Sequence, residues 1–509
     1  MLKRAFQALT GAEPGEQLPT LLSFLALLFL LLSYYLVKPL RDSLFLSYFV
    51  SRDMAWFSLP IIVLSLASAK FFNHWVGRVP RYRLMSITFA IMMACKLLFV
   101  LLLPIAGRWG TVVFFLWASI YFTLVLSILW GVVNTIFSSG QAERCFGFVA
   151  LGGTTGNIVG AQLSSWLAVS AFKDWALAFS VVAMGVALGL ILLAVRSSHP
   201  ESSEAAEKEH GAAATHVSRG WQDIQALFGN RYVRGIAMMV FALALISQAF
   251  QFQAYSQLDR NLAHQVYTQE FGWFDAQGAS FEKVFGFKRL DQAPQAEALK
   301  QLAQTAGLPA AGQAKLSDSY GRYQAELKSR TSKAFADVYK FQGLLGVFLL
   351  MVVARLLFRN VGLRWVVLIL PLFYILASLS VMFPLDVLVV QLLMMLAGSL
   401  NYSLNNATKE LLYTPTSEAV RFQFKPLIEG PVMRLGDLTA AILQIAVSST
   451  VVLWLALNDM AGGNVLLVLG LVFVLLWMLA IFHTGRRYDR AQQADAPLQE
   501  LDLAEDAHA

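Results

Sequence analysis

The chain has little charge and few cysteines, and it lacks the residue clusters on which most enzymes depend. Asp, Glu, Lys and Arg make up 14% of its 509 residues, too few to cover the surface of a soluble protein of this size. It has no His-rich or Cys-rich metal spacing, no phosphate-cradling glycine loop and no nucleophile elbow. We therefore expect no enzyme activity and no metal or cofactor. Cys95 and Cys145 lie in or beside apolar segments, which predicts buried thiols rather than a disulfide.

Long apolar runs dominate the chain instead. Hydrophobic residues make up 57% of it, and its mean hydropathy is +0.59. A helix of about 20 apolar residues crosses the hydrocarbon core of a bilayer. Twelve such runs can be placed, which predicts an all-α integral membrane protein. The predicted spans are 18–38, 55–76, 84–105, 110–137, 146–170, 174–195, 235–254, 341–359, 363–383, 385–408, 430–457 and 462–484.

A polar stretch divides these spans six and six. Its richness in Ala, Glu and Ser is typical of a disordered linker. A faint repeat supports the division, because Arg144 and Gly153 recur at one constant offset as Arg421 and Gly430. Two parallel six-helix halves are the architecture of major facilitator transporters. The predicted parts are an N-terminal half at 1–196, a cytoplasmic linker at 197–220, helix 7 at 221–254, a polar insertion at 255–340, helices 8–12 at 341–484 and a cytoplasmic tail at 485–509.

Positive charge predicts the orientation. The loops that follow even-numbered spans are rich in arginine, as at Arg78, Arg81, Arg83, Arg144, Arg196, Arg231, Arg359 and Arg421. The short loops on the other face hold little beyond Arg108 and Lys173. Since cytoplasmic loops carry the excess of Lys and Arg, we expect both termini in the cytoplasm and the 255–340 insertion outside it. We expect the bacterial inner membrane as the location.

The insertion has balanced charges and contains a helix-like stretch. This stretch ends at Gly307 with Pro309 beyond, a plausible C-terminal stop. The insertion is either a small cap over the mouth of a cavity or a decorated loop, and the sequence leaves both open.

Cations at membrane depth are the strongest site candidates. Lys38 and Arg41 end the first span about one turn apart, and Lys409 and Glu410 lie near the end of the tenth. An ion there is costly unless it faces water, a partner or a ligand. The functional interpretation is a wet cavity that holds a soluble anion. In the alternatives, Lys38 and Arg41 reach the lipid headgroups with Asp42 pairing Arg41, and Lys409 and Glu410 form an internal pair.

Further candidates lie deeper in the predicted spans. Lys96 sits in the middle of the third span, where it lines the cavity or pairs with an acid. Gln248 and Gln251 share a face of the seventh span, and Asn401 begins the polar part of the tenth. These amides either hydrogen-bond between helices or contact a base and ribose. Glycines recur every four residues at 152, 156 and 160, which indicates close helix packing.

Four stretches make the chain resemble the nucleotide transporter family, the ATP/ADP carriers of plastids and intracellular bacteria. They are Tyr-Tyr-Leu-Val-Lys-Pro-Leu-Arg-Asp at 34–42, Leu-Trp-Gly at 129–131, Ala-Glu-Arg through a glycine at 142–152, and the Tyr-Ser-Leu, Lys-Glu, Tyr, Pro pattern at 402–415. In that family, basic residues of the first and tenth helices are associated with nucleotide binding. The resemblance implies this role for Arg41, with Lys38 beside it, and for Lys409. The chain departs from the family at Ile128 and in the seventh span, where acids are expected.

The resemblance implies a twelve-helix carrier that works by alternating access, moving a nucleotide or related phosphorylated anion, possibly by exchange. Its candidate substrate-binding residues are Lys38, Arg41, Lys96, Gln248, Gln251, Asn401, Lys409 and Glu410. The expected partners are this substrate and the lipid bilayer, with no nucleic acid, and we expect a monomer. Two other functions stay open: transport of a different organic anion, and a non-transporting membrane protein whose external segment binds a partner.

Overall fold

The computed structural model describes residues 12–13, 15–76, 79–137, 139–198, 231–275, 281–290, 292–413, 425, 428–447, 464–479 and 481. Within these residues, every regular element is a helix. Each of the twelve predicted spans contains a described helix. Most of the predicted linker, the whole predicted tail and Arg421 of the repeat lie outside the described residues. The chain divides into unit 1, Met1–Val50, Val63–Ala214 and Asp259–Gly343, and unit 2, Ser51–Ile62, Thr215–Leu258 and Leu344–Ala509.

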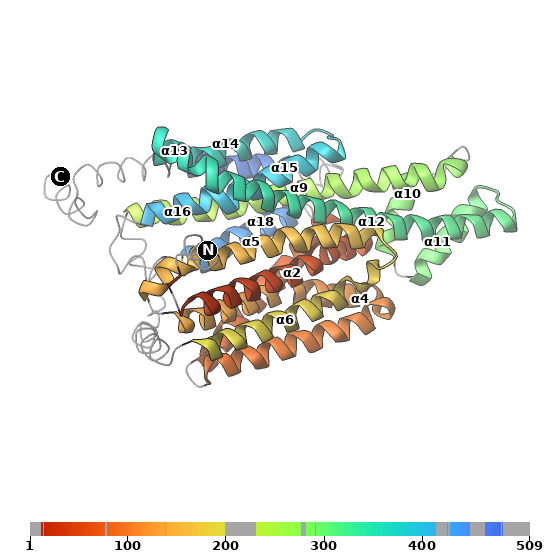
Figure 1. Ribbon diagram of the computed structural model, residues 1–509. Helices are drawn as coiled ribbons and strands as arrows, with labels where there is room; N and C mark the ends of the chain where they lie inside the picture. Colours follow the sequence, from red (N-terminus) through yellow and green to blue (C-terminus); the bar gives the residue numbers. More distant parts are fainter. Residues whose placement is uncertain are drawn as a thin grey trace. The chain divides into compact units, whose positions relative to one another are not determined.

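Unit 1 is built around four long helices that lie side by side (Figure 1). They are α2 (Gln17–Tyr48), α4 (Arg81–Ile136), α5 (Ser139–Val169) and α6 (Ala176–Ser197). Helix α4 contains two predicted spans, because the chain reverses at Gly107. There φ is 55°, a value that glycine adopts without strain. Ring contacts between the two arms, such as Phe99 with Phe114 at 5.1 Å, confirm the reversal.

The glycine stripe of α5 packs against the backbone of α2, as predicted. A Cβ atom added at Gly152 or Gly156 would overlap the carbonyl oxygens of Phe24 and Leu28, and one added at Gly160 would lie 2.8 Å from the Cα atom of Leu32. Only glycine permits this approach, which brings two apolar helices into direct backbone contact. Neither cysteine is in a disulfide, as predicted; Cys145 is buried, whereas Cys95 is only half-buried.

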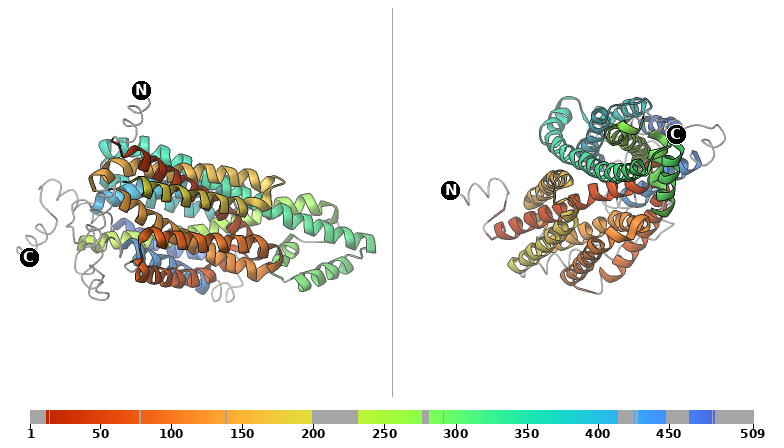
Figure 2. Two further views of the ribbon diagram at one scale, coloured as in Figure 1. Left: turned by 60° about the horizontal axis from the view of Figure 1, so that its bottom comes forward. Right: turned by 90° about the vertical axis from the view of Figure 1, so that its right-hand side faces the viewer.

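The predicted insertion is largely helical and continues the helices beside it. Helix α9 runs over Arg231–Asp275 and α12 over Ala310–Phe348, so the expected borders at 254 and 340 fall inside continuous helices. Between them lie α10 (Phe281–Gly286), η3 (Phe287–Arg289) and α11 (Gln292–Thr305). The stop at Gly307 is confirmed, since φ is +63° there. This part of unit 1 reaches beyond the ends of α4, α5 and α6 (Figure 2).

Unit 2 contains the first part of α9, up to Leu258, and several shorter helices, some of which are interrupted by π-helical turns. It contains α13 (Ala354–Asn360), α14 (Leu363–Val381), α15 (Val387–Leu400), α16 (Asn406–Tyr413), α18 (Met433–Ala446), a helix at Asn464–Leu479 and the start of α3 (Met54–Val76). The π-turns are η4 (Leu349–Val353), η5 (Asn401–Asn405) and η7 (Ile428–Val432). Within the described residues, six helices are long and apolar enough to cross a membrane, counting α4 as one.

Candidate functional site

Arg41 of α2 is held by the acidic residue that follows it. Its Nε and Nη2 atoms donate to Oδ1 of Asp42 at 2.8 and 2.6 Å, and Nη1 donates to Oγ of Ser119 on α4 at 3.3 Å. The Asp42 side chain is 1% exposed and that of Arg41 15%. The pairing of Arg41 with Asp42 was one of the sequence alternatives. The guanidinium nevertheless packs within the helices of unit 1, over the ring of Phe115 at 5.3 Å.

Lys38, one turn earlier, is surrounded by tyrosine rings. Its Nζ atom lies 5.9 Å from the ring centre of Tyr34, 5.5 Å from that of Tyr35 and 3.9 Å from that of Tyr339. A cation at these distances is attracted by the ring faces. Among the described residues, the Lys38 ammonium makes no hydrogen bond and no ion pair within 4 Å. It therefore retains donors that a ligand can use.

Tyr339 is a member of this cluster that the sequence did not reveal. It lies on α12, inside the segment expected to be an insertion, and no local motif marks it. Its hydroxyl donates to Oδ2 of Asp42 at 2.7 Å, while its ring faces Lys38. Asp42 thus accepts hydrogen bonds from Arg41 on one oxygen and from Tyr339 on the other. We call Lys38, Arg41, Asp42 and Tyr339 the α2 cluster, and all four belong to unit 1.

Lys96 is fully buried between α2, α4 and α6. Its Nζ atom donates to Oγ of Ser33 and to Oγ of Ser180, both at 2.6 Å, and lies 4.8 Å from the ring centre of Tyr121. The sequence offered a cavity or an acidic partner for this lysine. Among the described residues it has neither, and two hydroxyl groups take the place of a carboxylate.

In unit 2, Lys409 and Glu410 of α16 form ion pairs with different partners. Lys409 Nζ lies 3.6 Å from Oε1 of Glu429, and Lys425 Nζ lies 2.7 Å from both carboxylate oxygens of Glu410. The alternative of an internal pair between the two neighbours is therefore not what the structure has. The Glu410 side chain is 61% exposed, whereas that of Lys409 is 15% exposed. Of the two, Lys409 is the better placed to meet a ligand inside the bundle.

Two π-turns lie beside this lysine. Turn η5 begins at Asn401 and leads directly into α16, and η7 carries Glu429. A π-turn inserts one residue into a helical turn and so redirects the side chains that follow, and such turns occur often at functional sites. Asn405 Nδ2 donates to Oδ1 of Asn401 at 3.1 Å within η5. Asn401 is itself half-buried.

The glutamines of α9 fall into two groups. Gln253 donates to Oδ1 of Asn464 at 3.0 Å, which links two helices of unit 2. Gln251 instead bonds along its own helix, to the hydroxyl of Tyr255 at 2.8 Å. Gln248 is half-buried, like Gln251.

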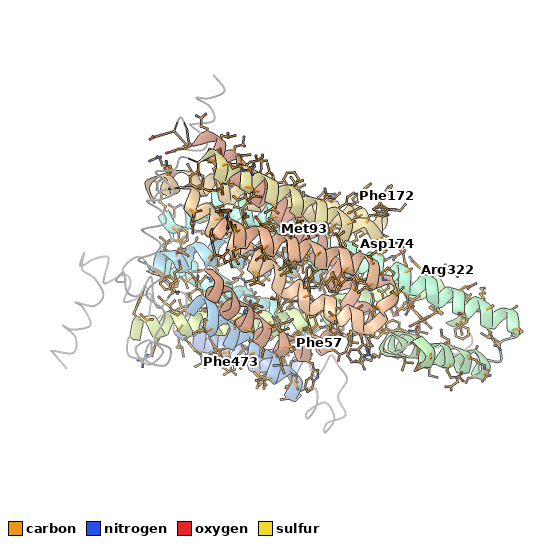
Figure 3. The ribbon with its side chains drawn as sticks, turned by 90° about the horizontal axis from the view of Figure 1, so that it is seen from below. Phe57, Met93, Phe172, Asp174, Arg322 and Phe473 are labelled. Carbon is orange, nitrogen blue, oxygen red and sulfur yellow. The ribbon has the colours of Figure 1, made fainter. Side chains whose placement is uncertain are left out.

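A cavity of about 400 Å³ lies elsewhere in unit 1, at the end of α5 beside α12. Figure 3 labels Arg322 of α12 and, near the same end, Asp174. The lining contains Lys173 and Arg322 but also Glu270 and Glu326. Arg322 is paired with Glu270 at 2.8 Å. Because the charges of this cavity balance, it is a poorer match for a polyanion than the α2 cluster.

Comparison with known proteins gives the class of the fold. No protein-family model matches the chain, and no curated protein matches it in sequence. Several solved structures do match. A mutant of the nucleoside transporter NupG has a TM-score of 0.53 at 13% identity, over 92% of this chain and 99% of that one. An auto-inhibited POT family peptide transporter gives 0.52 at 13%, over 93% and 96%.

A third similar structure is a bacterial homolog of the human lysosomal transporter Spinster, inward-facing and unoccupied. It has a TM-score of 0.53 at 12% identity, over 94% of this chain and 98% of that one. Identities this low establish the fold alone. The chain has the all-helical fold of these transporters along more than nine-tenths of its length.

Proposed function

We propose that the protein is a secondary transporter that moves a nucleotide or a related phosphorylated anion by alternating access, in exchange for another. The observation that carries the proposal is Lys38, whose ammonium lies among three tyrosine rings one turn before Arg41. A phosphate leaving water loses its hydration, and charge-assisted hydrogen bonds from nearby cations offset that cost. The major facilitator fold supports carriage of a solute, and the motifs of the α2 and α16 segments favour a nucleotide.

The aromatic residues around the α2 cluster fit the rest of such a ligand. Tyr34 stacks on Phe122 with ring centres 3.7 Å apart, and Tyr35 packs edge-on against Tyr339 at 5.8 Å. Flat ring faces next to cations suit a ligand that joins a base to phosphates, because the base stacks while the phosphates meet the charges. Gln248, Gln251 and Asn401 are proposed contacts for the sugar or base.

Lys409 of α16 is proposed as a further cation that binds phosphate. The 3.6 Å between Lys409 Nζ and Oε1 of Glu429 is long for a hydrogen bond, so this pair is weak. An incoming phosphate competes with Glu429 for the ammonium. Glu410, which bonds the exposed Lys425, has a smaller part in this proposal, and Lys96 keeps its role inside the bundle. Both termini are proposed to lie in the cytoplasm and the α10–α11 region outside it.

Uptake by proteoliposomes tests the proposal. Purified protein is reconstituted, the vesicles are loaded with ADP, and entry of labelled ATP is measured beside adenosine and a dicarboxylate. We expect entry of ATP that falls at least about tenfold in Lys38→Gln, since one charge-assisted contact is lost. Lys283→Gln, which removes an exposed lysine of α10, is the matched control and keeps wild-type uptake.

The other functions predict different results in the same assay. Uptake of the dicarboxylate with no uptake of ATP identifies a carrier of another organic anion. No solute-specific signal, in protein that is folded and correctly inserted, favours a membrane protein that binds partners. A thermal-shift screen against phosphorylated metabolites complements the assay, because a ligand of the folded state raises the unfolding temperature.

A further inference from the structure

Asp42 joins the cations of the α2 cluster to helix α12. Its Oδ1 atom accepts both hydrogen bonds from Arg41, at 2.8 and 2.6 Å. Its Oδ2 atom accepts the hydroxyl of Tyr339 at 2.7 Å. The carboxylate is almost fully buried, so these groups replace its lost hydration. The state of Arg41 and the attachment of α12 therefore depend on the same side chain.

Tyr339 also covers the second cation. Its ring lies 3.9 Å from the Lys38 ammonium, closer than either tyrosine of α2. Two cations and one carboxylate leave the cluster with net positive charge. A phosphate that binds both Lys38 and Arg41 competes with the Tyr339 ring for one and with the Asp42 carboxylate for the other.

Helix α12 is attached to unit 1 at a second place, away from the cations. Ser165 of α5 donates to Oδ1 of Asp337 at 2.7 Å, and Ser329 donates to the carbonyl oxygen of Ala168 at 2.6 Å. Loss of the Tyr339 contact thus loosens one attachment and leaves the other in place. The helix itself continues past Gly343 to Phe348.

From this geometry we infer that Asp42 occupies the place of the substrate anion beside Arg41 until substrate binds. We also infer that Tyr339 couples the displacement of Asp42 to α12. The inference rests on the proposed function. When phosphate oxygens take the donors of Arg41 and Lys38, Asp42 cannot remain beside them, because like charges repel at this distance. It turns away, the Tyr339 hydroxyl loses its acceptor, and this part of α12 is released. Asp42 thus competes with the substrate anion for Arg41, and Tyr339 is a positioning residue.

Affinity for ATP tests the role of Asp42. If the carboxylate competes with the ligand, Asp42→Asn binds ATP about tenfold more tightly, since no charged group has to be displaced. The KM for exchange falls in this variant, and turnover falls as well, because Tyr339 is no longer released by binding. Asp337→Asn removes a carboxylate of α12 that pairs with Lys333 and Lys340 and not with the α2 cluster, and it leaves the affinity within about twofold. Equal or weaker binding in Asp42→Asn overturns the inference.

Hydrogen–deuterium exchange of α12 tests the role of Tyr339. In the wild type, saturating ATP raises exchange around Tyr339. In Tyr339→Phe, exchange there is already high without ATP, and ATP adds little. Ser165→Ala removes the other attachment and keeps the response to ATP, which separates the two contacts. Should Asp42→Asn fail to fold, this comparison decides the inference by itself.

The outcomes separate this inference from the function on which it rests. ATP binding that is lost in Lys38→Gln, together with unchanged α12 exchange, retains the proposed function and overturns the role of Tyr339. If ATP, ADP, pyrophosphate and inorganic phosphate all fail to bind the wild type, both proposals are overturned.

Discussion

The Nζ atom of Lys96 and the Oγ atom of Ser180 lie 2.6 Å apart in the interior of unit 1, where no part of the lysine is exposed. Ser33 donates its own hydroxyl to the carbonyl oxygen of Ser180 at 2.7 Å, and the two Oγ atoms are 3.1 Å apart. The two serines therefore bond each other as well as the lysine. Their hydrogen bonds do not all depend on the ammonium.

This arrangement predicts that Lys96 can be replaced by an apolar side chain of similar length. Lys96→Met removes a buried cation that has no acidic partner among the described residues, and the serines keep their bonds to each other. Replacing a buried ion by a well-packed apolar group is often neutral or stabilising, by about 1–4 kcal/mol. We expect an unchanged or higher unfolding temperature for Lys96→Met in detergent. Lys96→Ala, which leaves a cavity, lowers it. A large loss of stability in Lys96→Met would falsify this account.

Gly156→Ala tests the contact between α5 and α2. The new methyl group overlaps the carbonyl oxygen of Leu28, so the helices must move apart. Overpacking of this kind costs about 1–3 kcal/mol, and we expect a lower unfolding temperature and a lower yield of folded protein. Gly189→Ala on α6 is the control, because a Cβ atom there meets nothing within 4 Å. If both variants behave alike, the close approach of α5 and α2 is not needed for stability.

The positions of the helices followed from the sequence because a bilayer imposes simple rules. Each span needs an apolar run of fixed length, and its backbone can be satisfied only within the helix. The glycine stripe and the stop at Gly307 were predicted for similarly local reasons. The reversal at Gly107 could be located to a few residues, since a polar Arg-Trp-Gly separates two apolar runs.

The partners of the site residues could not be predicted in this way. Tyr339 lies about 300 residues from Lys38 in the chain, in a polar stretch with no pattern that links it to α2. Serine is common in membrane helices, so nothing marked Ser33 and Ser180 as acceptors for Lys96. The pairing of Lys409 with Glu429 depends on how η7 and α16 fold, and charge spacing alone left open a pair with Glu410.

Lys409 and Glu410 provide a test of adjacent charges with different surroundings. Lys409→Ala removes a largely buried cation, and we expect uptake of labelled ATP to fall at least about tenfold without loss of expression. Glu410→Gln removes an exposed acid paired with Lys425, a type of pair worth about 0–1 kcal/mol, so uptake changes less than about twofold. Normal uptake by Lys409→Ala would show that this lysine is structural.

Two ion pairs outside the predicted spans, one buried and one exposed, allow a similar comparison of their contributions to stability. Lys288 of η3 pairs with Asp259 of α9, both almost fully buried, and also donates to the carbonyl oxygen of Leu46 at 3.2 Å. Arg260, the residue after Asp259 on α9, pairs with Glu282, and both of these side chains are exposed. Lys288→Met leaves the Asp259 carboxylate buried without its cation, which costs about 3–5 kcal/mol. We expect a clearly lower unfolding temperature.

Arg260→Met breaks the exposed pair next to it and costs at most about 1 kcal/mol, because water replaces the partner. The double variant Asp259→Leu/Lys288→Met removes both buried charges, so it recovers most of the stability lost in Lys288→Met. Thermal unfolding of the four proteins in one detergent measures these differences. Were Lys288→Met as stable as Arg260→Met, the η3 segment would not be held to the end of α2 by this ion pair. The α10–α11 region would then be attached through its other contacts, such as the hydrogen bond from Arg108 to the carbonyl oxygen of Arg289 at 2.6 Å.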